Sequence, residues 1–192
     1  MGTRQEAHRM RILPVLALSA ATLFLAGCSD VLSTEPLATE DDTLFDAALV
    51  GTWFDQDDTL ITVTSAKPPV YEILVIGTNE GDRHQLLGRL VQFGEQRILD
   101  VVDVNPGLYS IQGHVWIYLQ KKGKGIQIQY LDSKWFQEKV RQSGLAFFLA
   151  DKHPVVTAPS AKLREFVAKY GVQPEARGEA LELVPLLKKA SP

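Results

Sequence analysis

The feature that most constrains the fold is a series of β-strand patterns that recur about every ten residues between residues 59 and 131. Apolar and β-branched runs occupy residues 59–64, 70–76, 84–93, 97–104, 112–121 and 126–131. The segments between them are short, and two of them, Asn105-Pro106-Gly107 and Lys122-Gly123-Lys124-Gly125, have the composition of tight turns. At least six strands joined in this way predict an antiparallel meander, which forms a barrel or a sandwich.

Two short helices and further strands are expected after this meander. Asp132 can cap a helix over residues 133–142, which Gly144 would end. A second helix is predicted from Thr157 or Ala158 to Gly171. The remaining strand patterns are residues 145–149, 155–156 and 181–187.

The sequences of two of these late strands also predict where each strand lies in the fold. Leu145–Leu149 is apolar throughout, which predicts a buried strand. The strand over residues 181–187 contains Pro185, which has no backbone N–H to donate. Proline of this kind predicts a strand at the edge of a sheet.

Residues 1–27 have the pattern of an export signal. Three arginines within residues 1–11 precede an apolar run over residues 12–26, and a positive start followed by a short apolar stretch is typical of a secretory signal. The run is shorter than the roughly 20 residues that span a bilayer as a helix. It ends in Leu25-Ala26-Gly27-Cys28, which contains the only cysteine of the chain, so an intrachain disulfide is excluded.

This ending resembles the lipobox of bacterial lipoproteins. The resemblance implies cleavage before Cys28 and a diacylglyceryl group on its thiol, so that acyl chains anchor the protein to a membrane. Ser29 stands where an Asp favours inner-membrane retention in that family. The resemblance therefore implies the outer membrane, facing the periplasm, if the host is Gram-negative. The alternative is an ordinary secreted protein in which Cys28 occurs by chance.

Residues 28–45 are predicted to be an acidic tether between this anchor and a domain over residues 46–187. The segment is polar and contains no Lys or Arg, which is the composition of a flexible linker. As a flexible coil it would have a reach of about 20–25 Å, enough to hold the domain clear of lipid headgroups. The same acidic run could instead dock on a basic partner.

Gly51-Thr52-Trp53 lies just before the first long strand pattern. The motif resembles the Gly-x-Trp entry of lipocalins and other calycin barrels, and residues 46–171 resemble uncharacterised bacterial lipocalin-like lipoproteins. The resemblance implies a mainly β fold, an antiparallel lipocalin-like meander barrel with two short helices. Gly51 would allow a sharp turn into the barrel and Trp53 would close its bottom. It also implies an Arg over this Trp, for which Arg141 and Arg164 are both candidates.

The strand over residues 112–121 supplies the candidate ligand-facing residues. One of its faces carries His114, Trp116 and Tyr118, and the other carries aliphatic side chains. In a barrel one of the two faces lines the interior, so the three residues form either a wall of a ligand cavity or core packing under the helix over residues 133–142. The cavity is expected between the sheet and that helix.

The residue patterns of enzymes and metal sites are not found in the sequence. His84, His114 and His153 lie on separate predicted elements without zinc spacing, and there is no GxSxG, SxxK, Walker A or GxGxxG motif. Asp100 and Asp103 point to opposite faces of one strand, and Asp100 is a candidate buried hydrogen-bonding carboxylate. A net charge of -3 does not indicate nucleic-acid binding. We therefore predict no catalytic residues, no cofactor and no bound metal.

Two functions are consistent with these sequence features. The first is a non-enzymatic, lipid-anchored module that binds a small apolar ligand in its barrel. The second is a periplasmic interaction protein, such as a protease or lysozyme inhibitor, or an accessory factor of envelope assembly. A hollow barrel favours the first function. A barrel filled by Phe147, Phe148 and side chains of the meander favours the second.

Overall fold

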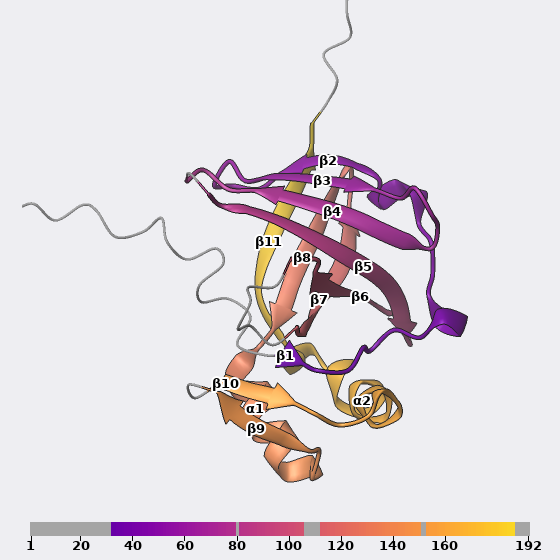
Figure 1. Ribbon diagram of the computed structural model, residues 1–192, viewed down its shortest axis with the longest axis vertical. Helices are drawn as coiled ribbons and strands as arrows, with labels where there is room; N and C mark the ends of the chain where they lie inside the picture. Colours follow the sequence, from indigo (N-terminus) through magenta and orange to yellow (C-terminus); the bar gives the residue numbers. More distant parts are fainter. Residues whose placement is uncertain (1–31, 80, 106–111, 151–152, 187–192) are drawn as a thin grey trace, which may run out of the picture.

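The computed structural model describes residues 32–79, 81–105, 112–150 and 153–186 and contains a closed antiparallel β-barrel (Figure 1). Its eight strands are β2 (Gly51–Phe54), β3 (Leu60–Thr64), β4 (Val70–Ile76), β5 (Arg83–Phe93), β6 (Gln96–Asp103), β7 (His114–Lys122), β8 (Gly125–Leu131) and β11 (Arg177–Pro185). The barrel closes because β11 pairs with both β8 and β2. The prediction of a mainly β meander barrel with two short helices is confirmed, and the architecture is consistent with a lipocalin-like fold.

The alternation of side chains along these strands produces two separate hydrophobic cores, one on each side of the barrel wall. The interior cluster consists of the buried residues Leu49, Trp53, Tyr71, Ile73, Leu90, Leu99, Val101, Ile126, Ile128 and Leu183. The outer cluster includes Val91, Phe93, Ile98, Trp116, Tyr118 and Leu131 from the barrel strands, together with residues from outside the barrel. The part of the β5–β7 wall around Val91, Ile98 and Trp116 is therefore buried on both of its faces.

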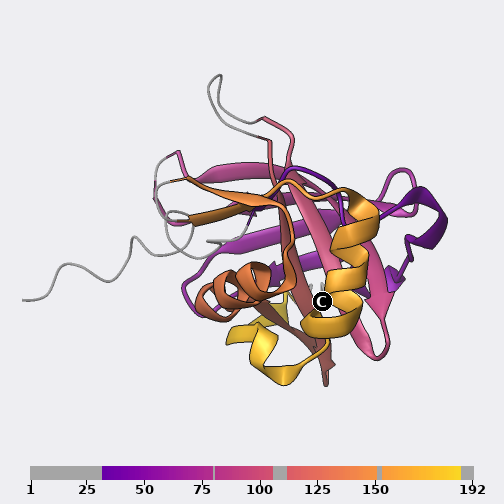
Figure 2. The ribbon, with the colours of Figure 1, turned by 90° about the horizontal axis from the view of Figure 1, so that it is seen from below.

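The outer cluster is covered by a cap, which we define as residues 133–171. Its elements are α1 (Ser133–Ser143), β9 (Phe147–Ala150), β10 (His153–Val156), α2 (Ser160–Phe166) and the π-helical turn η3 (Val167–Gly171). Phe136 and Val140 of α1 are fully buried in the outer cluster. Figure 2 shows the two helices in front of the barrel when the molecule is seen from below.

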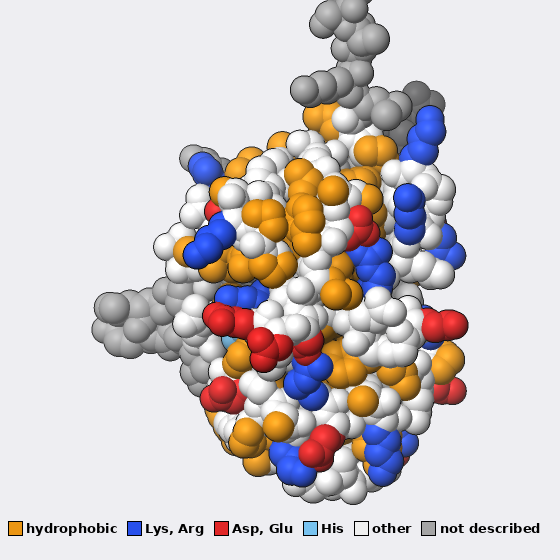
Figure 3. Space-filling view, turned by 90° about the vertical axis from the view of Figure 1, so that its right-hand side faces the viewer, with side chains coloured by type: hydrophobic (Ala, Val, Ile, Leu, Met, Phe, Trp, Pro, Cys, Tyr) orange, Lys and Arg blue, Asp and Glu red, His pale blue; other side chains and the backbone are white. Residues whose placement is uncertain are grey.

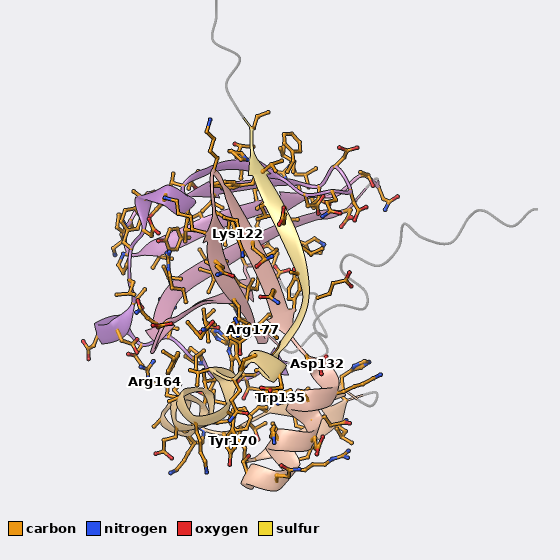
Figure 4. All side chains as sticks on the ribbon, turned by 180° about the vertical axis from the view of Figure 1, so that it is seen from behind. Lys122, Asp132, Trp135, Arg164, Tyr170 and Arg177 are labelled. Carbon is orange, nitrogen blue, oxygen red and sulfur yellow. The ribbon has the colours of Figure 1, made fainter. Side chains whose placement is uncertain are left out.

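Both predicted helices of the cap are confirmed, and local sequence explains both ends of α1. The Asp132 carboxylate accepts a hydrogen bond from the backbone N–H of Trp135 at 2.7 Å, and Gly144 ends α1 with a φ of 70°. Aromatic contacts then hold the two helices together (Figure 4). The Phe166 ring lies with its centroid 6.5 Å from that of Trp135 and 5.2 Å from that of Tyr170.

The segment before the barrel is packed against it, so the prediction of a flexible tether is wrong for residues 32–45. β1 (Leu32–Ser33) pairs with β10 and with β7. Leu37 is fully buried, and the Asp100 carboxylate of β6 accepts the backbone N–H groups of Leu37 and Ala38 at 2.8 and 3.0 Å. The segment is ordered because a buried acceptor and the outer cluster lie beside its few apolar residues. Residues 28–31 and the predicted signal, residues 1–27, lie outside the described residues.

The cap holds this segment from its other side. The Arg164 Nη1 donates to the backbone carbonyl of Leu37 at 2.9 Å, and the Arg164 guanidinium also forms an ion pair with Asp42 of the 3-10 turn η1 (Glu40–Asp42). The guanidinium lies over the Phe93 ring, 5.1 Å from its centroid. Figure 3 shows acidic side chains in a band at the height of η1 and apolar side chains above them, at the height of the 3-10 turn η2 (Ala47–Leu49).

Two further strand predictions need correction. The last strand is not an edge strand, because β11 begins at Arg177 and lies between β8 and β2. Pro185 is its final residue and is opposite Trp53, so the missing N–H falls where the ladder ends. The strand predicted to be buried at residues 145–149 is β9, in which Phe148 and Leu149 are exposed.

Candidate ligand cavity

The barrel interior contains a cavity of about 140 Å³. Its walls consist mainly of aliphatic and aromatic side chains of the interior cluster and its neighbours. These are Leu49, Trp53, Ile61, Val63, Tyr71, Ile73, Val75, Leu86, Leu99, Val101, Ile117, Leu119, Ile126, Ile128, Leu181 and Leu183. An apolar cavity of roughly 150 Å³ stays dry and binds benzene, whereas pockets for drug-sized ligands begin at about 300 Å³. The cavity therefore fits an apolar molecule of about the size of benzene.

One end of this cavity is acidic, and we call it the acidic mouth. Asp55 and Asp82 line the cavity there, in the β2–β3 and β4–β5 connections. Both connections lie at the same end because successive connections of a meander alternate between the two ends of the barrel. Asp55 is 8% exposed, and its Oδ1 accepts the backbone N–H groups of Asp57 and Thr59 at 2.9 Å each. These bonds fix a carboxylate beside the apolar interior.

A histidine lies next to the acidic mouth. The His84 Nε2 is 3.4 Å from the Asp82 Oδ1, and the His84 Nδ1 is 3.6 Å from the Asp103 Oδ2. All three side chains are partly exposed. Their arrangement adds one carboxylate, that of Asp103, and an imidazole to the rim, so the charge that an entering molecule meets at this end is predominantly negative.

Trp53 lies at the other end of the cavity. Its indole is 7% exposed, its Nε1 donates to the backbone carbonyl of Leu49 at 3.1 Å, and it borders both the cavity and a separate depression on the outer surface. The indole therefore stands between the ligand cavity and solvent. Gly51 begins β2 beside this indole: a Cβ built on Gly51 would lie 3.7 Å from the Trp53 Nε1.

Neither arginine proposed to cover Trp53 lies there. Arg164 belongs to the cap, where it contacts Phe93, and Arg141 is exposed on α1. Arg97 is the arginine that borders the depression beside Trp53.

Arg97 also ties η2 to the barrel. Its Nη2 is 2.7 Å from the Asp46 Oδ2. The pKa of Asp46 is lowered from its ordinary value, mainly because its carboxylate accepts the Ala48 backbone N–H and also because Arg97 lies beside it. The Tyr71 hydroxyl accepts the Asp46 backbone N–H at 2.6 Å, which links this end of the barrel to the interior cluster.

The candidate ligand-facing residues His114, Trp116 and Tyr118 do not line the cavity. They project from the outer face of β7, while Ile117 and Leu119 of the same strand project into the cavity. The sequence allowed these three side chains either to line a ligand cavity or to pack in a core under the helix over residues 133–142. In the structure they pack in the core under α1. The expected cavity between the sheet and this helix is also wrong, because that space is filled by the outer cluster.

Tyr118 and Trp116 join the barrel to the cap, and His114 pairs with a neighbouring barrel strand. The His114 Nδ1 lies 2.9 Å from the Asp100 Oδ1. The Tyr118 hydroxyl donates to the Gly171 carbonyl at 2.9 Å, and burial raises the pKa of Tyr118. Trp116 packs edge-on against Phe136, with ring centroids 6.0 Å apart. Within the described part of the chain, no acceptor lies within hydrogen-bonding reach of its buried Nε1.

Sequence patterns did not reveal the two carboxylates of the acidic mouth or the role of Gly88. A Cβ on Gly88 would lie 3.1 Å from side-chain atoms of Ile73 and of Leu99, so this glycine lets the interior side chains approach the wall of β5. The isolated Gly within a strand pattern was a usable signal. No local pattern distinguishes Asp55 or Asp82 from the other acidic residues in turns.

Comparison with known proteins gave no matching family model, no matching curated protein and no matching solved structure. Among the described residues, no group of three or more His, Cys, Asp or Glu side chains is arranged to hold a metal ion. In the same part of the chain, no helix is long and apolar enough to cross a membrane. Cys28, the predicted site of lipidation, lies outside the described residues.

Proposed function

We propose that this chain is a lipid-anchored, non-enzymatic lipoprotein of the cell envelope whose barrel binds a small, uncharged apolar molecule. The single observation that supports ligand binding is the apolar cavity of about 140 Å³ inside the barrel. Phe147 and Phe148 belong to β9 of the cap and leave the interior unfilled. This hollow interior favours ligand binding over the alternative, a periplasmic inhibitor or envelope-assembly factor.

The acidic mouth supports an uncharged ligand. A carboxylate on the ligand would be brought next to Asp55 and Asp82, and like charges that face each other at an interface cost several kcal/mol. Among the described residues, those that line the interior include no Lys, Arg or His, so they offer an anion no cationic side chain. The favoured ligand is therefore a small hydrocarbon, alcohol or similar neutral compound, and fatty-acid anions are disfavoured.

The ligand preference can be measured with n-hexanol and n-hexanoate, which share one alkyl chain. We expect hexanol to bind at least about tenfold more tightly than hexanoate at neutral pH, because only hexanoate carries a charge to the mouth. Isothermal titration calorimetry gives both affinities. The variant Asp82→Asn should narrow the difference, whereas Asp57→Asn, an exposed neighbour that does not line the cavity, should leave it unchanged. Equal affinities for the two compounds would contradict the proposed role of the mouth.

The anchor and location are proposed from the lipobox resemblance at Cys28 and from Ser29, which favours the outer membrane facing the periplasm in a Gram-negative host. We expect the protein purified from membranes to begin at Cys28 and to carry a diacylglyceryl group on its thiol. Mass spectrometry of the N-terminal peptide measures both, and Cys28→Ser is the matched control that cannot be lipidated. An unmodified Cys28 in the membrane fraction would contradict this part of the proposal.

A further inference from the structure

The cap exposes apolar side chains on a strand that, among the described residues, is paired on one side only. β9 pairs with β10 and lies at the end of the strand order. Its Phe148 and Leu149 are 42% and 47% exposed. Phe148 and Leu149 are adjacent, so their side chains point to opposite faces of β9, and the edge strand exposes an apolar side chain on each face. Phe147, on the same face as Leu149, packs on the outer cluster. An exposed Phe-Leu pair on an edge strand is typical of a surface that contacts a partner or a membrane.

The cap also differs from the rest of the molecule in charge. Its described residues carry six Lys and Arg against two Glu, whereas the described residues from 32 to 132 carry seven Lys and Arg against fourteen Asp and Glu. The exposed cations of the cap include Lys134, Arg141, Lys162 and Lys169. A positive, partly apolar face on an otherwise acidic protein is complementary to an anionic lipid surface.

The packing of residues 32–45 brings this face close to the anchor. Leu32 follows Cys28 by only four residues, and four residues span at most about 14 Å. Leu32 is opposite Val155 of β10, and Val155 is opposite Phe148 of β9. With strands about 4.8 Å apart, Phe148 lies about 10 Å from Leu32. A lipid on Cys28 would therefore hold the β9 edge near the lipid headgroups, and the barrel domain would not be separated from the membrane by a flexible linker.

We propose that the cap is a membrane-docking surface, in which Phe148 and Leu149 enter the interface of an anionic bilayer and the cap cations contact its headgroups. The proposal uses the lipid anchor of the proposed function for the distance argument alone. The apolar edge and the charge of the cap support it independently. Docking by this face orients the molecule, with the cap towards the lipid and the barrel beyond it.

A groove on the cap supports the same occupant. It lies between the end of α1 and α2 and measures about 500 Å³. Leu145, Phe166 and Tyr170 line it, together with Lys162, Glu165 and Lys169. The Lys162 Nζ lies 2.7 Å from the Glu165 Oε2, so the two lysines leave the groove with a net positive charge of one. An apolar floor with a net positive rim suits a lipid, whose headgroup is anionic and whose remaining part is apolar.

The test uses the chain from residue 29, which contains every described residue and no cysteine. A single dye that brightens in apolar surroundings is attached after Phe148→Cys, or after Val184→Cys as the control. Val184 is 54% exposed on β11 of the barrel. We expect dye emission to rise severalfold at position 148, and to stay constant at 184, when vesicles of phosphatidylcholine with about 30 mol % phosphatidylglycerol are added. Vesicles of phosphatidylcholine alone should give little change at either position.

A second pair of variants tests the charge without touching the apolar edge. The double variant Lys162→Glu and Lys169→Glu should weaken binding to the anionic vesicles at least about tenfold. The double variant Lys121→Glu and Lys124→Glu makes the same charge change on the exposed β7–β8 hairpin and should alter binding less than about twofold.

Several results would overturn the docking surface: equal dye responses at the two positions, no response at 148, equal responses to neutral and anionic vesicles, or equal effects of the two lysine pairs. The test is independent of the anchor, because the chain from residue 29 lacks Cys28. Finding an unmodified Cys28 in cells would thus contradict lipidation but not docking to vesicles. Failure of the chain to dock on vesicles would contradict the docking surface but not lipidation.

Discussion

Replacing Asp100 with Ala should lower the free energy of unfolding by about 3–5 kcal/mol. Asp100 is 4% exposed, and its Oδ2 accepts the backbone N–H groups of Leu37 and Ala38. Removing the carboxylate leaves these two buried donors without their acceptor, and each unsatisfied donor costs about 1–3 kcal/mol. His114 loses its partner at the same time. Urea unfolding followed by tryptophan fluorescence measures the change.

Asp103→Ala is the matched control for Asp100→Ala. Asp103 lies on the same strand but is partly exposed, so its loss should cost less than about 1 kcal/mol. Because Asp100 holds the segment that contains Leu37, Asp100→Ala should also make residues 32–45 susceptible to limited proteolysis under native conditions. A similar loss of stability in the two variants would contradict the role given to Asp100.

Filling the barrel cavity should abolish ligand binding with little loss of stability. Val101 is 4% exposed and lines the cavity. The larger side chain of Val101→Phe can enter the empty space, so we expect benzene affinity to fall at least about 100-fold while the free energy of unfolding changes by less than about 1.5 kcal/mol. Calorimetric titration with benzene and urea unfolding give the two quantities.

Val91→Phe makes the same change on the other side of the barrel wall. Val91 is 1% exposed in the outer cluster, where it does not border the cavity. Overpacking there should cost about 1–3 kcal/mol and leave benzene affinity within about threefold. If Val101→Phe retained normal benzene binding, or if Val91→Phe lost it, the barrel cavity would not be the binding site.

The strand pattern predicted the meander, but it could not decide which face of β7 points inward. Alternation separates the His114, Trp116 and Tyr118 face from the aliphatic face and treats the two equally. The orientation of β7 depends on the cap, which follows β8 in the chain and begins with α1. The cap buries the aromatic face of β7 from outside the barrel. Aliphatic side chains are left to line the interior. Sequence periodicity within one strand contains no information about a cover that comes from a later segment.

Long-range contacts also explain why the tether prediction failed. The acidic composition of residues 28–45 matches that of a linker, whereas contacts with Asp100, more than 60 residues away, and with Arg164, more than 120 residues away, fix Leu37 and Ala38. The local signals that did succeed are those with a local cause, such as the Asp132 cap and the Gly144 end of α1. The edge strand predicted from Pro185 was wrong for the same reason, because the position of β11 between β8 and β2 depends on the closure of the whole sheet.

The most direct test of the central claim, that the barrel interior binds a small apolar molecule, is a benzene titration followed by methyl NMR. Benzene should cause saturable shifts in the Ile73, Ile117 and Ile128 methyl groups, which line the cavity. The methyl groups of Val156 and Leu163, buried in the outer cluster, should not shift. Absence of saturable shifts in the barrel interior, or shifts confined to the outer cluster, would contradict the claim.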